Sequence, residues 1–189
     1  MALVHLPGFY SPVLVTTSVG VFIAAFDEVI SKLFAGRKIT AVGLSVGAIV
    51  ALGLRSPEVR AVLAVEPFFS TAKLWPIIYF VRHMLRADEA LPRAFAADIF
   101  GVTQVSITDR DYSAVLQRSD RPALAVFGDV PLNPSRDVIG LPSLADEADR
   151  TRLPHVVTLG GHAVPTSVIR GALRILEGPH QPASQSVDR

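Results

Sequence analysis

The sequence predicts a single α/β domain in which helices cover both faces of a mostly parallel central sheet. Short runs of β-branched and apolar residues alternate with longer helix-like stretches, the pattern produced when helices connect parallel strands. Half of the 189 residues are apolar and 19% are charged, which is sufficient for one packed core. The domain is expected over residues 1–178, followed by a disordered polar tail over residues 179–189.

The strands are expected where short runs are dominated by apolar and β-branched residues. These runs are Ala2–His5, Val13–Thr17, Lys38–Gly43, Val59–Val65, Ala123–Phe127 and Val156–Leu159. Helices are expected where apolar residues recur at three- and four-residue intervals or where small apolar residues follow a tight turn. These stretches are Phe22–Phe34, Ala48–Leu54 and Ser167–Leu176.

The bulky segment Thr71–Gly101 lies between two core strands and is expected to form a small helical cap. Its large apolar side chains are expected either to line an acyl-binding pocket above the sheet or to pack into the core. They are Trp75, Ile77, Ile78, Tyr79, Phe80 and Met84.

The charge balance and the absent cysteines exclude several classes of function. The sequence contains eighteen Lys and Arg and seventeen Asp and Glu, and the basic residues form no stripe. No nucleic-acid partner is therefore expected. The lack of cysteine excludes disulfides, thiolate zinc sites and a Cys nucleophile. The five histidines are scattered and no phosphate-binding glycine loop is present, so neither a metal nor a cofactor is expected.

The most apolar window, Pro12–Phe26, is interrupted by polar residues and is shorter than the ~20 residues of a membrane-spanning helix. The N-terminus has no Lys or Arg before its first apolar stretch, unlike a secretory signal. We therefore expect a cytoplasmic protein with no integral membrane segment. The sequence does not specify its oligomeric state.

The pentapeptide Gly43–Gly47 matches the pattern G-x-S-x-G, in which a serine occupies a strained turn between a strand and a helix. Here it follows an apolar strand and opens an apolar helix, as the motif requires. Ser45 is therefore the candidate nucleophile, and the Val46 N–H at the helix start is a candidate donor to an oxyanion. The alternative is a glycine-rich turn with an ordinary capping serine.

A serine nucleophile needs a base, and histidine is the side chain suited to that task near neutral pH. His162 lies in a Gly-Gly-His sequence just after the last expected strand, where the glycines allow the ring to reach over the sheet edge. The other four histidines lie at a strand end, in the cap, before a strand and in the tail. His162 is therefore the candidate base.

The order of these features resembles the α/β-hydrolase family over most of the chain. A strand, G-x-S-x-G and a helix are followed by a strand ending in Gly-Asp and a strand ending in Gly-Gly-His before a final helix. The resemblance implies a catalytic triad in the order serine, acid, histidine. It also implies that Leu6–Phe9 is the oxyanion loop, with the Phe9 N–H as the second donor; the alternative is a simple Pro-Gly turn.

The resemblance places the acid three residues after Gly128, where this sequence has Pro131. Asp129 still lies at the carboxyl end of that strand and is the first candidate to orient the imidazole. Asp137 in the following loop is a second candidate. Glu66, at the end of an earlier strand, matches the alternative acid position of some lipase-like relatives. Without any of them, a Ser-His dyad would work at a reduced rate.

These residues predict a carboxylic ester hydrolase that forms an acyl-enzyme on a small-molecule acyl substrate. Thioesterase or acyltransferase activity at the same site is an alternative. The family's antiparallel strands before the oxyanion loop are missing here, so a minimal or N-terminally shortened hydrolase is expected. With the displaced acid, this also leaves open a non-catalytic protein that uses the hydrolase fold for binding.

Overall fold

The computed structural model describes residues 2–8, 14–72, 74, 81, 85, 90–118, 120–130 and 142–178. The strands in this part of the chain are β1 (Ile39–Leu44), β2 (Val59–Val65), β3 (Ala123–Gly128) and β4 (His155–Thr158). The helices are α1 (Val19–Leu33), α2 (Val46–Gly53), α4 (Ala90–Phe100), α5 (Glu147–Arg150) and α6 (Thr166–Glu177), with the 3-10 helix η1 (Ser113–Arg118). None of these helices is both long enough and apolar enough to cross a bilayer.

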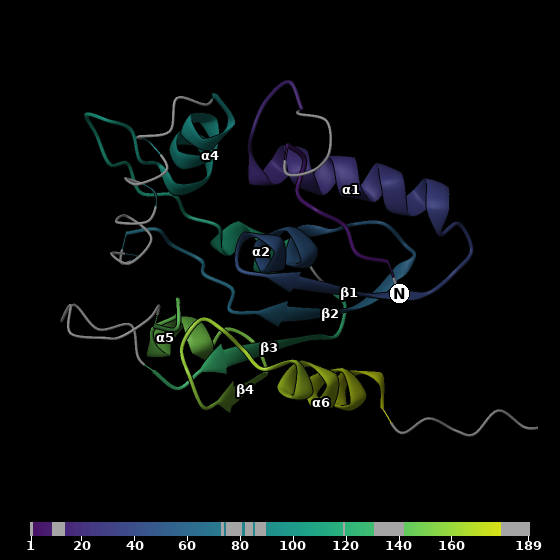
Figure 1. The fold of residues 1–189 in the computed structure, drawn as a ribbon. Helices are drawn as coiled ribbons and strands as arrows, with labels where there is room; N and C mark the ends of the chain where they lie inside the picture. The colour runs from purple at the N-terminus through teal and green to yellow at the C-terminus, as the bar shows by residue number, and fades with distance from the viewer. Residues whose placement is uncertain are drawn as a thin grey trace, which may run out of the picture.

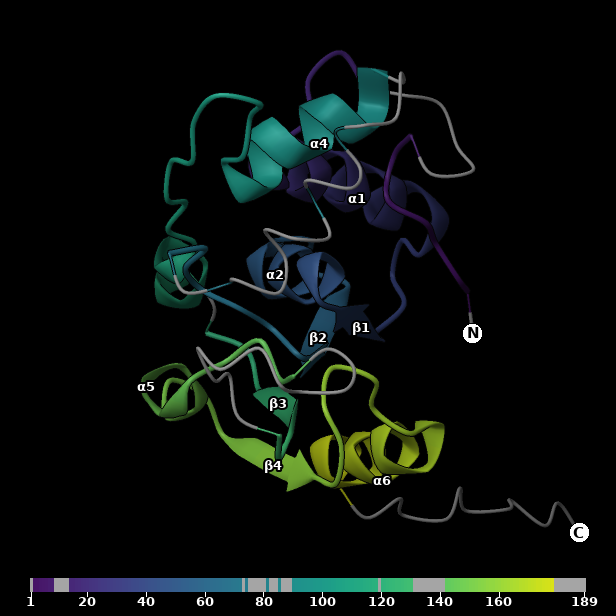
Figure 2. The same ribbon diagram turned by 60° about the vertical axis from the view of Figure 1, so that its left-hand side comes forward.

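The four strands form one sheet in the order β1-β2-β3-β4, and every neighbouring pair is parallel. Figure 2 shows α2 and α5 on one face of this sheet and α6 on the other, with α1 outside α2. In Figure 1, α4 lies beyond α2 at the end of the molecule where α1 begins. The α/β class with a parallel sheet is therefore confirmed.

The central strands and long helices lie where the sequence predicts them. β2 coincides with the expected strand, and its residues are buried except for Arg60. Burial on both faces explains the continuous apolar run Ala61–Val65, which is typical of an internal parallel strand. The other three strands and the three expected helices match within a few residues. The short helices α5 and η1 were not anticipated.

The two strands expected at the N-terminus are not formed in the described residues. Residues 2–8 contain a turn but no strand, and Leu3 and Val4 are exposed. Their apolar character is insufficient because a strand is stabilised by pairing and by burial of one face. In the second run Val13 lies outside the described residues, and Val15 is fully exposed.

The residues after that run start a helix instead of ending a strand. Ser18 has extended backbone angles, and its hydroxyl accepts a hydrogen bond from the Val21 N–H at 3.2 Å. This N-cap satisfies one of the donors that a helix start leaves unpaired. Further along α1, the Asp27 carboxylate accepts hydrogen bonds from the Arg55 and Ser56 N–H groups at 2.8–3.1 Å. Asp27 therefore fastens α1 to the chain that leaves α2.

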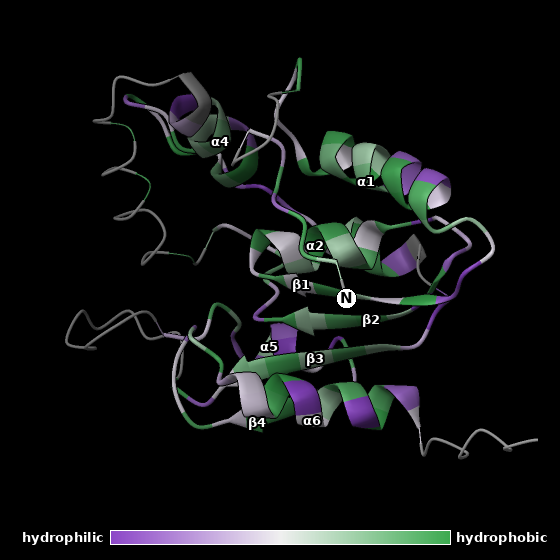
Figure 3. Cartoon of the chain, turned by 45° about the vertical axis from the view of Figure 1, so that its right-hand side comes forward, coloured by the Kyte–Doolittle hydropathy of each residue, from purple (hydrophilic) through white to green (hydrophobic). Residues whose placement is uncertain are grey.

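Helix α6 covers β2 and β3 but leaves β1, the edge strand beside β2, partly uncovered. Its apolar side packs on Leu63 and Val65, which are fully buried. Figure 3 shows hydrophilic residues alternating with hydrophobic ones along α6, as expected for an amphipathic surface helix. Val42 and Leu44 pair with Leu63 and Val65 on the same face, yet they are 49% and 56% exposed. β1 is thus an edge strand with an uncovered apolar side.

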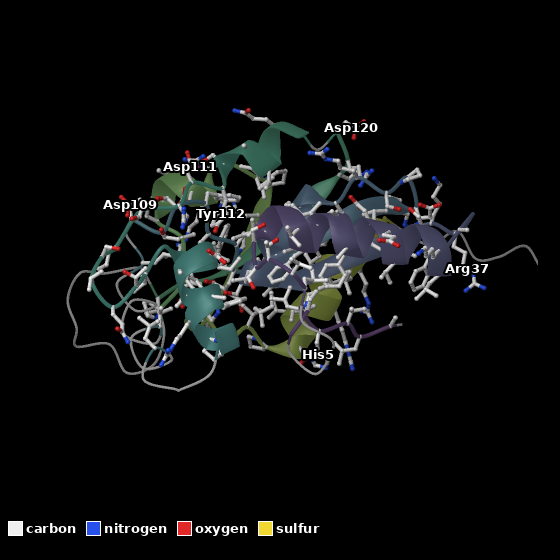
Figure 4. All side chains as sticks on the ribbon, turned by 90° about the horizontal axis from the view of Figure 1, so that it is seen from above. His5, Arg37, Asp109, Asp111, Tyr112 and Asp120 are labelled. Carbon is white, nitrogen blue, oxygen red and sulfur yellow. The ribbon has the colours of Figure 1, made fainter. Side chains whose placement is uncertain are left out.

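The cap prediction is tested only in part, because residues 75–80, 82–84 and 86–89 lie outside the described residues, and with them all six candidate pocket side chains. The described helix α4 packs Phe95 and Phe100 against the core that also contains Phe22 of α1. Tyr112 fastens this helix because its hydroxyl donates to the Ile99 carbonyl at 2.6 Å. Burial raises the Tyr112 pKa to about 12. Figure 4 shows Asp109, Asp111 and Tyr112 gathered on the side of the molecule away from Arg37.

Ser45 is the single residue between β1 and α2, and a close backbone crossing makes this connection possible. A Cβ on Gly43 would lie 2.0 Å from the Gly47 carbonyl oxygen and 2.6 Å from the Ala48 nitrogen. A Cβ on Gly47 would meet nothing within 4 Å. The first glycine is therefore required by the packing of strand against helix, whereas the second has free space.

We expect Gly43→Ala to lower the free energy of unfolding by at least about 2 kcal/mol, because backbone must move to admit the methyl group. Gly47→Ala is the matched control and should leave stability unchanged or raise it by up to about 1 kcal/mol through helix propensity. Urea denaturation followed by circular dichroism measures both. Equal losses in the two variants would contradict the crossing geometry.

We expect Asp27→Ala to cost about 1–3 kcal/mol of unfolding free energy, because two N–H groups lose their acceptor. The adjacent Glu28→Ala serves as the control, since Glu28 only pairs with Lys32 on the exposed side of the same helix. Thermal denaturation of the two variants side by side tests this expectation. A wild-type melting temperature for Asp27→Ala would show that the link from α1 to residues 55–56 adds nothing.

Candidate active site

The carboxyl ends of the four parallel strands bring the candidate residues to one edge of the sheet. Ser45 follows β1, Glu66 follows β2, Asp129 follows β3, and His162 lies in the loop after β4. In open parallel sheets this edge is where ligands bind, because the loops there come from several strands. Ser45 and His162, which are more than 100 positions apart in the sequence, are thereby brought to the same edge of the sheet.

Ser45 has the strained backbone expected of a nucleophile turn. Its φ of 55° and ψ of −119° lie outside the regions that residues with a Cβ normally occupy. The Ser45 N–H donates to the Val65 carbonyl at 2.9 Å, and the Ser45 carbonyl accepts from the Ala48 N–H at 2.9 Å. Its side chain makes no capping hydrogen bond. The hydroxyl is therefore not used to stabilise α2.

Glu66 is a fully buried carboxylate at the end of the next strand. One of its oxygens accepts a hydrogen bond from the Gly128 N–H at 2.5 Å, and the other accepts from the Leu144 N–H at 2.7 Å. Such hydrogen bonds offset the cost of removing a carboxylate from water. Glu66 also has a φ of 50°, and it shares a positive φ only with Ser45 among the described non-glycine residues.

The ring of His162 lies next to this carboxylate. Its Nδ1 is 3.5 Å from the Glu66 oxygen that also accepts from Leu144, and the side chain is 19% exposed. Nδ1 is buried and has no hydrogen bond in this geometry. A separation of 3.5 Å is slightly too long for a hydrogen bond, and catalytic hydrogen bonds are often long in the absence of ligand. No hydrogen bond joins the Ser45 hydroxyl to this ring in the described structure.

No hydrogen bond or ion pair joins the Asp129 carboxylate to the imidazole in the described residues. Its carboxylate is exposed and accepts a hydrogen bond from the Gly160 N–H at 2.8 Å, two residues before His162. These contacts do not support the prediction that Asp129 orients the ring, because its carboxylate is hydrogen bonded to the backbone of the histidine loop. Of the three carboxylates considered, Asp137 lies outside the described residues. The structure brings Glu66 to His162.

No sequence pattern indicated the groups that hold Glu66 in place. Leu144 contributes through its backbone N–H, so no side-chain pattern marks it. Arg150 of α5 donates to the Gly128 carbonyl at 2.7 Å, and its guanidinium lies 5.9 Å above the Phe127 ring. It thus anchors the end of β3. An arginine just after a helical acidic cluster carries no sequence signal for such a contact.

Two backbone N–H groups are predicted to donate to an oxyanion, and one of them lies in the described part of the chain. Val46 is the first residue of α2, and the first N–H groups of a helix have no partner within the helix. Phe9 lies outside the described residues, although the preceding Pro7–Gly8 turn is present and Gly8 has a φ of 89°. The position of the second donor remains a prediction.

Two surface hollows lie away from this edge. One of about 440 Å³ is at the amino end of β3, lined mainly by Leu52, Leu116, Pro122, Leu153 and Pro154. The other, of about 250 Å³, lies between the start of α1 and residues 110–115. Across the described ranges no group of three His, Asp or Glu side chains is arranged to hold a metal ion.

The protein resembles known proteins in its structure, whereas its sequence matches none of the families or curated proteins compared. No protein-family model matches the sequence, and no curated protein matches it. Similar solved structures include a lipase-esterase related protein from Clostridium acetobutylicum, with a TM-score of 0.59 and 16% identity over 88% of this chain and 79% of that one. An esterase from Pyrococcus furiosus has a TM-score of 0.57 and 15% identity, over 89% of this chain and 66% of that one.

A hydrolase from Pseudomonas aeruginosa gives a TM-score of 0.54 at 16% identity, over 89% of this chain and 75% of that one. Identities at this level describe architecture and not activity. The all-parallel sheet, the flanking helices and these neighbours agree on one architecture. The chain has the α/β-hydrolase fold.

Proposed function

We propose that this protein is a serine hydrolase that cleaves carboxylic esters through an acyl-enzyme. Ser45 is the nucleophile, His162 is the general base, and Glu66 is the carboxylate that orients the imidazole. Val46 and Phe9 donate their N–H groups to the oxyanion. The observation that carries the proposal is the approach of the buried Glu66 carboxylate to His162 Nδ1, 3.5 Å away, at the sheet edge where Ser45 stands.

Backbone strain supports the assignment of Ser45 and Glu66. A positive φ at a residue with a Cβ costs about 1–3 kcal/mol, and such residues cluster at sites of function. The two described non-glycine residues with this conformation stand side by side at the ends of β1 and β2. An ordinary turn between a strand and a helix does not require two strained residues on adjacent strands.

In the first half of the reaction, Ser45 Oγ attacks the ester carbonyl carbon while His162 Nε2 takes the hydroxyl proton. The carbonyl π electrons move to oxygen, where the proposed N–H donors stabilise the negative charge. Collapse of this intermediate breaks the bond to the alcohol, which leaves with the proton from His162. In the second half, water repeats the sequence and releases the carboxylic acid and free Ser45.

Glu66 contributes by fixing the imidazole. A carboxylate at Nδ1 selects the tautomer that leaves Nε2 free to accept the serine proton, and it stabilises the imidazolium that forms. Its own orientation is fixed by the Gly128 and Leu144 N–H groups. Closing the 3.5 Å gap to a hydrogen bond requires a shift of less than 1 Å, which substrate binding can supply.

We expect a fluorophosphonate probe to label the wild-type protein at Ser45, as located by peptide mass spectrometry. Ser45→Ala should abolish labelling because the nucleophile is gone, and His162→Ala should slow it by about 10³-fold or more. Glu66→Gln should also slow it strongly, since the carboxamide cannot stabilise an imidazolium. Circular dichroism must show that each variant is folded.

His155→Ala is the matched control, because His155 lies on β4 and packs edge-on to Phe127, away from Ser45. It should be labelled at the wild-type rate. Absence of labelling in folded wild-type protein would overturn the hydrolase proposal and favour a binding role for the fold. If labelling succeeds, parallel assays with 4-nitrophenyl esters and acyl thioesters distinguish an esterase from a thioesterase.

A further inference from the structure

We propose that Asp129 is a positioning residue that holds the loop carrying His162 against the end of β3. The proposal rests on the proposed function, since it concerns how the base of that reaction is kept in place. It assigns to Asp129 a role different from that of the triad acid. The two roles make opposite demands on the chemistry of the side chain, so they can be separated by experiment.

Within the described part of the chain, the hydrogen bonds of Asp129 lead to the end of β4 and to the loop that follows it. Its backbone N–H donates to the Thr158 carbonyl at 2.8 Å, which extends the pairing of β3 with β4 by one residue. Its carboxylate then accepts from the Gly160 N–H at 2.8 Å, and the next residue, Val130, donates to the Gly160 carbonyl at 3.1 Å. Three hydrogen bonds therefore connect residues 129–130 to Thr158, the last residue of β4, and to Gly160 in the loop that follows.

The residue before Asp129 is shaped to admit the same loop. A Cβ on Gly128 would lie 2.2 Å from the Gly160 carbonyl oxygen and 2.3 Å from that of Gly161. The loop backbone thus crosses directly over the Gly128 Cα. Gly160 itself has a φ of 116°, a conformation that favours glycine. His162 is the residue after Gly161, so its backbone position depends on this crossing.

Gly128 also helps to fix the position of the Glu66 carboxylate. The Gly128 N–H donates to Glu66 at 2.5 Å, while Gly128 and Asp129 hold the loop that carries the base. The distance between Glu66 and His162 is therefore set by a short stretch of chain at the end of β3. Removing the Asp129 carboxylate breaks one of the three hydrogen bonds between residues 129–130 and residues 158–160 and lets the imidazole drift relative to Glu66. Displacements of about 1 Å cost up to 10²-fold in rate.

The chemistry required of Asp129 is that of a hydrogen-bond acceptor. An asparagine side chain places a carbonyl oxygen where the carboxylate oxygen stood and can accept the same N–H. Because Asp129 is exposed, the new NH₂ group faces water. A triad acid needs its negative charge, and replacement of such an acid by its amide loses about 10⁴-fold in kcat. Asparagine at 129 thus separates the two roles.

We expect Asp129→Ala to lower kcat for 4-nitrophenyl butyrate about tenfold with KM changed less than about twofold, because base alignment and not binding is affected. Asp129→Asn should restore kcat to within about threefold of wild type. Glu66→Gln in the same assay should lose far more than either. If Asp129→Asn is instead as inactive as Glu66→Gln while folded, Asp129 is the acid and the proposal is overturned.

Hydrogen exchange of the Gly160 amide, followed by NMR, tests the contact without any need for activity. Asp129→Ala should accelerate exchange at Gly160 at least about tenfold, and Asp129→Asn should retain most of the protection. Wild-type exchange together with wild-type kcat in Asp129→Ala would overturn the proposal. If the wild-type protein is not labelled by fluorophosphonate, the proposed function fails; altered Gly160 exchange then shows that Asp129 holds the loop but overturns its role in catalysis.

Discussion

The burial of the Glu66 carboxylate is the interaction on which the carboxyl edge of the sheet depends. A carboxylate without access to water is tolerated only when its oxygens are hydrogen bonded, and here the donors come from the end of β3 and from residue 144. Three separate stretches of chain must therefore be correctly placed before the site is stable. The side chain that contacts His162 is also the one that joins these stretches.

The sequence predicted the parts of the fold whose burial is complete or whose periodicity is long. β2 is apolar on both faces and α1 spans four turns, so each produces a clear pattern. It predicted strands wrongly at Ala2–His5 and Val13–Thr17, because β propensity does not reveal whether a partner strand is available. Helices as short as α5 contain too few residues to show a period.

The candidate site was predictable where a motif fixes the backbone, and only there. G-x-S-x-G specifies a turn as well as a residue, and the structure contains that strained turn at Ser45. The acid has no such local signature, because which carboxylate reaches the imidazole depends on side-chain direction across three strands. Counting three residues from Gly128 led to Pro131, and Asp129 became the first candidate because it lies at the end of the same strand. Glu66 reaches His162 from a strand nearly a hundred residues earlier in the sequence. The signal that could have favoured Glu66 is a glutamate directly after the apolar run Ala61–Val65.

The positive φ angles of Ser45 and Glu66 have a consequence for evolution and engineering. Glycine relieves that backbone strain, so at Ser45, whose hydroxyl makes no capping contact, replacement by glycine favours the fold. Selection for thermal stability alone would therefore drift toward the loss of the hydroxyl. With Ser45 as the proposed nucleophile, thermal stability and activity make opposite demands on this turn, and a library screened only for survival on heating would be enriched in inactive members.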